Sequence, residues 1–190
     1  MRLRNIPGAK DAIAESIYVI QNPQENKGNW DKVFPQHQPV HLEVGMGKGR
    51  FLMDMAKLHP EINYIGIDLK DVVLAPAKRV IEAAFGEKPV QNVALTGHDI
   101  ERLPEIMDEH DRVERIYINF CNPWPKPRHW KRRLTYPTRL RDYRALLDPQ
   151  GEIWFKTDDG PLYRDTLRYL EEAGYQVYWC TEDLHADPCG

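Results

Sequence analysis

The stretch VHLEVGMGKGRFL, residues 40–52, decides the fold. Residues 40–44 are predicted to form a short strand between Pro39 and Gly45, and a turn containing Gly45, Gly47 and Gly49 follows directly. Beyond the turn, residues 49–59 place apolar side chains on one face at helical spacing. A strand, a glycine-rich turn and a helix in this order predict the start of a βαβ unit.

The same alternation continues along the chain. Strands are predicted at 40–44, 63–68, 92–96, 115–120, 152–157 and 175–180, and helices at 49–59, 74–85, 137–147 and 161–173. This order predicts an α/β fold, a mostly parallel sheet with helices on both faces, whose ligands bind at the carboxyl ends of the strands. We expect a single domain, with an N-terminal arm or helix over 1–38, the core sheet over 39–180 and a tail over 181–190.

Composition excludes several classes of protein. The 190 residues are 42% apolar and 29% charged, which is typical of a globular chain. No apolar run reaches the roughly 18 residues of a membrane span, and Met1–Asp11 lacks the apolar core of a signal peptide. Three cysteines without a CxxC pair (Cys121, Cys180 and Cys189) favour neither a disulfide framework nor a zinc site. We therefore expect a cytoplasmic protein without a metal or membrane contact.

Charge is concentrated in one segment. The net charge is −3, but residues 126–144 carry eight lysines and arginines and one acid, so this segment is +7 and the remainder is −10. Such a patch is typical of a nucleic-acid contact.

The glycine-rich turn admits several interpretations. A P-loop needs Ser or Thr after its lysine, but Gly49 follows Lys48, and a dinucleotide turn needs a glycine where Arg50 stands. The remaining pattern, G-x-G-x-G preceded by Glu43, suits a cationic nucleoside without phosphates such as S-adenosylmethionine. The alternative is an ordinary glycine-rich turn.

Two further acids end the next predicted strands. Asp68 lies 21 residues after Gly47, where an acid accepts hydrogen bonds from ribose hydroxyls. Asp99 follows the third strand, where a side chain can meet an adenine amino group. Either alone is also typical of turn chemistry.

The loop after the fourth predicted strand combines prolines, aromatic rings and basic residues. Three prolines within residues 123–127 stiffen it, and Asn122 stands at the mouth of the predicted sheet. Trp124 and Trp130 offer flat faces for a base, and the cations of residues 128–133 can neutralise phosphates. The loop therefore predicts an RNA contact, and a solvated basic loop is the alternative.

Six segments make the resemblance specific: RLRN, GNWDKVF, HLEVGMGKGRFL, NYIGID, NPWPKPRHWKRRLT and IWFKTDD. In this order they resemble the bacterial tRNA (guanine-N7)-methyltransferase family over nearly the whole chain. The resemblance implies a class I methyltransferase fold, S-adenosylmethionine as methyl donor, and methylation of guanine N7 at position 46 in the variable loop of tRNA. It also implies tRNA as the partner. We expect the chain to be a monomer or a weak homodimer.

Carried over by position, the resemblance assigns cofactor binding to Glu43, Asp68 and Asp99, beside the three glycines of the turn. Asn122 falls where the family has an aspartate assigned to catalysis and cofactor binding. Lys126 and Asp158 match substrate-contacting positions, and Lys156 is their neighbour. The RNA-contacting run corresponds to Arg128, His129, Trp130, Lys131, Arg132 and Arg133.

Two departures from the family pattern matter. The first is Asn122, whose neutral side chain lowers the expected rate of methyl transfer. The second is the end of the chain, because the family continues into a T-x-x-E motif and an antiparallel seventh strand between the fifth and sixth. We therefore expect a truncated tail, a missing seventh strand, and an unpaired edge on residues 175–180.

Two rival functions stay open at this stage. Asn122 and the short tail favour a catalytically weak or inactive RNA-binding relative. Asn-Pro after the fourth strand also resembles the N-P-P-aromatic motif of amino-group methyltransferases, but here the aromatic residue is displaced by one position. His129 is not expected to act as a general base, because guanine N7 carries no proton.

Overall fold

The computed structural model describes residues 13–14, 16–69, 71–85 and 91–187. The expectations for Met1–Asp11, the RLRN segment and Cys189 lie outside these residues. Six strands form one sheet in the order β1-β4-β3-β2-β5-β6. Their bounds are Val19–Ile20, Val40–Val44, Asn63–Asp68, Val93–Gly97, Val113–Asn119 and Leu147–Lys156 for β1 to β6.

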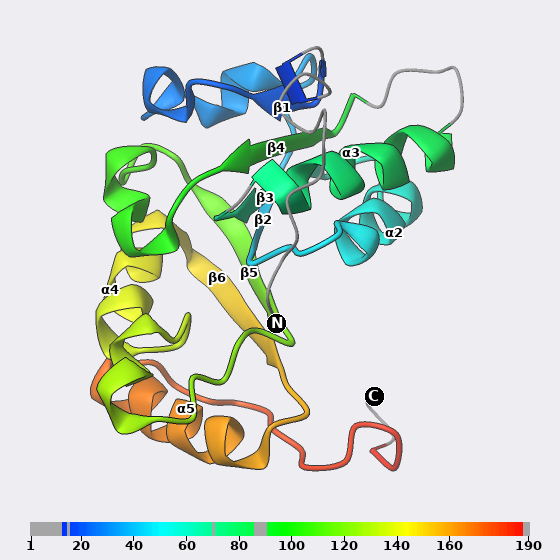
Figure 1. Ribbon diagram of the computed structural model, residues 1–190. Helices are drawn as coiled ribbons and strands as arrows, with labels where there is room; N and C mark the ends of the chain where they lie inside the picture. The colour runs from blue at the N-terminus through cyan, green and yellow to red at the C-terminus, as the bar shows by residue number, and fades with distance from the viewer. Residues whose placement is uncertain (1–12, 15, 70, 86–90, 188–190) are drawn as a thin grey trace.

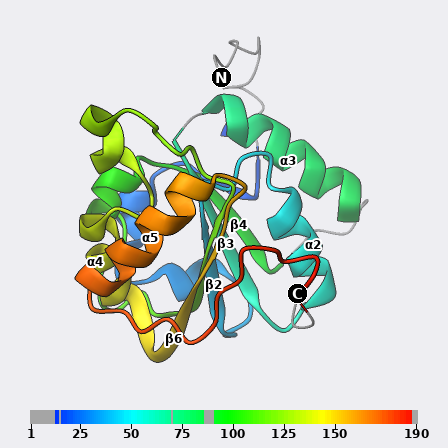
Figure 2. The ribbon, with the colours of Figure 1, turned by 90° about the horizontal axis from the view of Figure 1, so that it is seen from below.

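Helices cover both faces of this sheet. The order along the chain places α2 (Arg50–Leu58) after β2, α3 (Asp71–Phe85) after β3, α4 (Pro137–Leu146) before β6 and α5 (Gly160–Glu172) after it. Helices α2 and α3 lie on one side of the strands, and α4 and α5 lie on the other (Figures 1 and 2). Every strand pairing is parallel, as right-handed βαβ connections require. The predicted fold class is confirmed.

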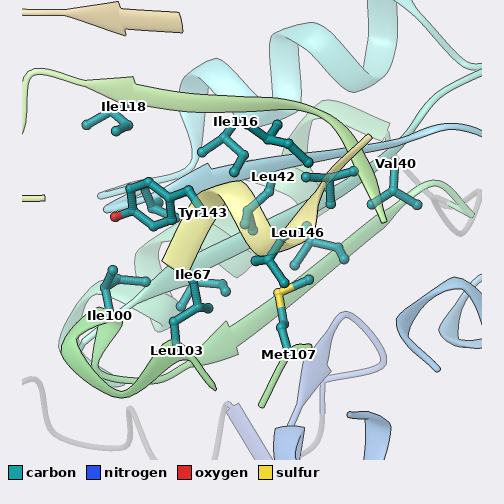
Figure 3. Packing of buried hydrophobic residues seen from close by; sticks show 14 of the residues in the cluster. Val40, Leu42, Ile67, Ile100, Leu103, Met107, Ile116, Ile118, Tyr143 and Leu146 are labelled. Carbon is teal, nitrogen blue, oxygen red and sulfur yellow. The ribbon is translucent and has the colours of Figure 1, made fainter. Parts of the chain in front are cut away.

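Two apolar clusters hold the layers together. One face of the sheet packs on α4 and η3, a 3-10 helix over Ile100–Glu105, through buried side chains that include Leu42, Ile116, Tyr143 and Leu146 (Figure 3). The opposite face packs on α2 and α3 through Leu52, Leu74 and Ile81. A strand buried on both faces explains why residues 40–44 are all buried, the polar His41 and Glu43 included.

The segment before β2 is anchored to the core by a buried tryptophan. Trp30 is 1% exposed, and its indole N–H donates to the Ile106 carbonyl at 2.7 Å. Asp111 accepts from the backbone N–H groups of Gly28 and Trp30 at 2.7 and 3.0 Å. Strand β1 precedes this anchored segment and lies at the edge of the sheet beside β4. The sequence pattern does not predict β1, because this strand is only two residues long.

The prediction of a strand over Tyr175–Cys180 is wrong. This segment has no strand structure, and residues 176–180 are exposed. A strand needs a neighbouring ladder to satisfy its backbone groups, and no described strand pairs with the outer edge of β6.

Strand β6 also begins earlier than predicted, at Leu147 rather than Glu152. Val113 pairs with Leu147 and Arg115 pairs with Glu152, so residues 148–151 form an irregularity within the strand. No helix among the described residues is long and apolar enough to cross a membrane.

Candidate active site

Three glycines shape the turn between β2 and α2. Gly45, Gly47 and Gly49 have φ angles of 73°, 55° and 68°, in the left-handed region where a side chain is strained. A Cβ atom on Gly47 would have no atom within 4 Å, so open space lies over this glycine. The turn therefore exposes its backbone to a ligand at the carboxyl end of β2.

Glu43 lies in the middle of the sheet, one residue before the end of β2. Its side chain is buried at 3% exposure, and Oε1 accepts a hydrogen bond from Asn119 Nδ2 at 3.3 Å. Its other oxygen, Oε2, is buried and has no hydrogen-bond partner among the described residues. Burial raises the pKa of this carboxyl to about 7, and nearby Asp68 raises it further, whereas the Asn119 hydrogen bond and the nearby Leu52 backbone N–H oppose the rise. A buried carboxylate oxygen without a partner suits a cationic ligand.

The two other predicted acids follow adjacent strands. Asp68 ends β3 and pairs with Gly97 of β4, and Asp99 comes two residues after that glycine. Asp68 accepts from the backbone N–H of Gly47 at 3.0 Å, which ties this carboxylate to the glycine turn. Asp99 caps helix η3 by accepting from Glu101 N–H at 2.9 Å. Each carboxylate thus has a structural role in its own loop.

The loop after β5 is strained at two points. Phe120 and Trp124 have φ angles of 48° and 43°, which are outliers for bulky side chains. Asn122 lies between them, and its Oδ1 accepts from the Trp124 backbone N–H at 3.1 Å. Its amide oxygen therefore helps to shape the loop.

The basic run forms 3-10 helix η4 (Pro127–Arg132), and most of its members face solvent. Lys126, Arg128, Lys131 and Arg132 are exposed, and the Arg132 guanidinium lies 5.3 Å from the Trp124 ring centroid. His129 and Trp130 are half-buried. Arg133 differs from the rest of the run, because it is 2% exposed and bonded to protein groups.

The basic loop and the glycine turn meet directly. A Cβ atom on Gly45 would lie 2.9 Å from Cδ1 of Leu134, the residue that follows the basic run. Asn119, at the end of β5, contacts Glu43 from the same strand pair. The loop therefore lies beside the glycine turn, at the carboxyl ends of β2 and β5.

The remaining predicted residues join this edge through β6. Lys156 ends β6, pairs with Asn119, and places its Nζ 5.6 Å from the Phe120 ring centroid. Asp158 follows two residues later and is exposed. A hollow of about 540 Å³ lined by Pro60, Phe85 and Asn92, among others, lies at the amino ends of β3 and β4, so it is not part of this edge.

Sequence reasoning missed three residues here. Asn119 is a polar residue ending a buried strand, a signal that could have marked it. Phe120 is 58% exposed despite its size, and Asp165 pairs with Arg133 from helix α5. Neither exposure nor a contact across 32 residues can be read from local pattern.

Comparison with known proteins places this site in a family. A family model described as a putative methyltransferase matches residues 37–189. A tRNA (guanine-N(7)-)-methyltransferase of Clostridium perfringens (strain SM101 / Type A) is 48% identical over 188 residues, covering 97% of this chain and 86% of the relative. The enzyme of that name from Acetivibrio thermocellus is 45% identical and covers 98% of this chain and 86% of the relative. The chain belongs to the tRNA (guanine-N(7)-)-methyltransferase family.

Solved structures support the fold of this tRNA (guanine-N(7)-)-methyltransferase family member. A precorrin-6y C5,15-methyltransferase from Geobacter metallireducens GS-15 has a TM-score of 0.57 at 15% identity, covering 73% of this chain and 63% of the other. A ribosomal protein L11 methylase from Lactobacillus delbrueckii subsp. bulgaricus has a TM-score of 0.55 at 15% identity, covering 78% and 67%. Both share the fold of the class I methyltransferases.

Proposed function

We propose that this chain transfers a methyl group from S-adenosylmethionine to N7 of a guanine in the variable loop of tRNA. The contact between Leu134 and Gly45 carries the proposal, because it joins the basic loop to the glycine turn at one edge of the sheet. A donor held by the turn and a base held by the loop meet at the carboxyl end of β5. The relatives are named for methylation of guanine N7 in tRNA, which supports the same reaction here.

The residues of the turn fit the donor. S-adenosylmethionine supplies an electrophilic methyl group on a sulfonium centre. Glu43 binds a positive group of this ligand, because its buried Oε2 has no partner among the described residues. Asp68 and Asp99 accept hydrogen bonds from the ribose and the adenine, and the open space over Gly47 admits the ligand backbone.

The methyl-accepting atom, guanine N7, needs to be aligned with the methyl group and does not need a general base. Guanine N7 has a lone pair and no proton, so positioning and electrostatics supply the rate enhancement. Asp158 is exposed after β6 and accepts from the guanine N1–H and N2 amino edge. Lys126 holds a neighbouring carbonyl or phosphate, and Asn122 borders the reacting methyl.

Phe120 provides a flat face at the same place. It directly follows Asn119, the partner of Glu43, and lies two residues before Asn122. Its ring is exposed to water, and its left-handed backbone conformation is strained. Strained backbone conformations of this kind cluster at binding sites. We assign this ring to stacking on the target guanine, a contact that aromatic side chains make with unstacked bases.

The four exposed cations of the loop, Lys126, Arg128, Lys131 and Arg132, bind tRNA phosphates. Four such contacts predict a slope of about −3 in log affinity against log salt concentration. His129 contributes stacking or hydrogen bonding rather than charge, because partial burial and the cations Arg128, Arg132 and Lys126 lower its pKa.

Labelled S-adenosylmethionine and tRNA transcripts test the reaction. We expect label in the tRNA and aniline-induced strand cleavage at the methylated guanosine in the variable loop. The matched control carries 7-deazaguanine at that position, which removes only the nucleophilic N7. Label that persists on the 7-deaza transcript would place the methyl group on another atom and overturn the proposal.

A further inference from the structure

Arg133 uses its guanidinium within the protein. Nε donates to the Pro123 carbonyl oxygen at 2.8 Å, and Nη1 donates to Asp165 Oδ2 at 2.6 Å and to the Tyr169 hydroxyl at 3.2 Å. The guanidinium also lies 5.0 Å from the Trp130 ring centroid. With 2% exposure, Arg133 reaches an RNA phosphate only by breaking these contacts.

Asp165 is built to keep this partner. It lies in helix α5, where Arg168 also donates to its carboxylate. Burial opposes ionisation of Asp165, but the hydrogen bonds from Arg133 and Arg168 outweigh it and hold its pKa below the usual value. The pair is therefore charged at neutral pH, and removing the Asp165 charge leaves the buried Arg133 guanidinium without an ionic partner among the described residues.

The carbonyl that Arg133 binds belongs to the centre of the candidate site. Pro123 lies between Asn122 and Trp124, the two residues joined by the hydrogen bond from Trp124 N–H to Asn122 Oδ1. Prolines at 123, 125 and 127 deprive this segment of backbone donors, so it cannot hold itself by a regular ladder. The left-handed Trp124 adds strain that surrounding contacts must maintain.

We infer that Arg133 and Asp165 are positioning residues that fasten the Asn122–Trp124 turn to helix α5, and that Arg133 is not an RNA contact. The inference rests on the proposed function for its effect on rate. The tether itself is a contact between the loop and the helix, and it is measurable without methyl transfer. Because a misplacement of about 1 Å can cost roughly 100-fold in rate, loosening the turn slows chemistry more than binding.

Three single variants distinguish a residue that positions the loop from a residue that binds an RNA phosphate. Asp165→Asn removes the charge at constant size, Arg133→Lys keeps the charge but loses the planar fork, and Arg132→Ala removes an exposed cation of the same run. For Asp165→Asn and Arg133→Lys we expect kcat to fall about 10- to 100-fold with KM for tRNA within about threefold. Arg132→Ala is expected to flatten the salt dependence of tRNA binding by about 0.7–0.9 and to raise KM.

The double variant Arg133→Lys/Asp165→Asn tests the coupling. If the two residues act as one tether, kcat of the double variant falls no further than that of the worse single variant. Multiplying effects on kcat would overturn the pairing. A salt slope that flattens by about 0.7–0.9 in Arg133→Gln, which removes the charge, would show instead that Arg133 binds a phosphate.

Hydrogen exchange at the Trp124 amide keeps the test independent of activity. We expect about tenfold faster exchange at Trp124 in Asp165→Asn, with unchanged exchange in helix α3, which lies on the opposite face of the sheet. Unchanged Trp124 exchange in both single variants would overturn the tether. If the unaltered chain transfers no methyl group while the exchange result holds, the proposed function fails and the tether stands.

Discussion

Asn119 and Glu43 stand on adjacent parallel strands, and the Asn119 side-chain amide donates to Glu43 Oε1 at 3.3 Å. This hydrogen bond favours the carboxylate form of Glu43, but burial outweighs it and raises the pKa to about 7. The charge on the floor of the candidate site therefore changes across the neutral pH range. A cation that binds this carboxylate must therefore also drive the loss of its proton in the molecules in which Glu43 is protonated.

We expect affinity for S-adenosylmethionine to fall about tenfold when the pH is lowered from 8 to 6, because the ionised fraction of a group with a pKa of about 7 falls by that factor. Calorimetric titration at each pH measures the effect. Glu43→Gln should bind more weakly at pH 8 and lose most of the pH dependence. A profile of the unaltered chain that stays flat between pH 6 and 8 would contradict this role of Glu43.

The same shift affects the stability of the ligand-free chain. Folding raises the pKa of Glu43 from its ordinary value of 4.5 to about 7, so the contribution of this group to folding stability is fully present below pH 4.5 and is lost as pH rises through about 7. At pH 8, Glu43→Gln should therefore unfold at a higher temperature than the unaltered chain. The gain in free energy of unfolding should be at most about 3 kcal/mol. The difference should shrink towards pH 5, and thermal unfolding at both pH values checks it.

Asn122→Asp should raise the rate of methyl transfer, up to 10²–10³-fold if a negative charge here stabilises the transition state. Aspartate keeps an acceptor for the Trp124 N–H, so the loop retains its shape. Asn122→Ala removes that acceptor and should lower both activity and protection of the loop. Single-turnover assays compare the variants, and equal or slower transfer by the aspartate variant counts against the idea.

Gly45→Ala and Gly47→Ala form a matched pair. Both place a Cβ on a left-handed residue, which costs about 1–2 kcal/mol. Only Gly45→Ala also meets a neighbour, with Leu134 Cδ1 at 2.9 Å, so it should destabilise the fold more. Gly47→Ala points into open space and should mainly weaken S-adenosylmethionine binding. Unfolding midpoints and binding titrations distinguish the two, and a reversed order would argue against this geometry.

Replacing Phe120 tests base stacking. Phe120→Asn removes the ring but tolerates the left-handed backbone, and it should lower kcat/KM for tRNA about 5- to 150-fold, the range expected for a lost stack of 1–3 kcal/mol. Phe120→Trp should retain most activity. Affinity for S-adenosylmethionine should change little in either variant. Full activity in Phe120→Asn would remove Phe120 from the substrate site.

The sequence predicts the cofactor side of the candidate site better than it predicts the basic loop. Glu43, Asp68 and the three glycines follow from local order, because parallel strands bring their carboxyl ends to one edge of the sheet. The basic run is also visible as charge, but its members are not equivalent. Arg132 faces solvent, whereas Arg133 is buried against α5, and nothing in the run of cations distinguishes them.

Residues 175–180 show the same limit for the prediction of secondary structure. The apolar and aromatic residues of this segment have strand propensity, yet Tyr178 is 72% exposed and the segment has no strand structure. Propensity describes a residue's fit to a pleated surface, whereas a strand exists only beside a partner that accepts its hydrogen bonds.

The sequence by itself determined the alternation of strands and helices, the glycine turn after β2 and the family to which the chain is similar, because these depend on local periodicity and on residue order. Tertiary structure alone decided that Arg133 pairs with Asp165, that Glu43 keeps an oxygen without a described partner, and that Tyr175–Cys180 forms no strand. Burial and pairing arise from segments far apart in the chain, and their free energies exist only once those segments meet.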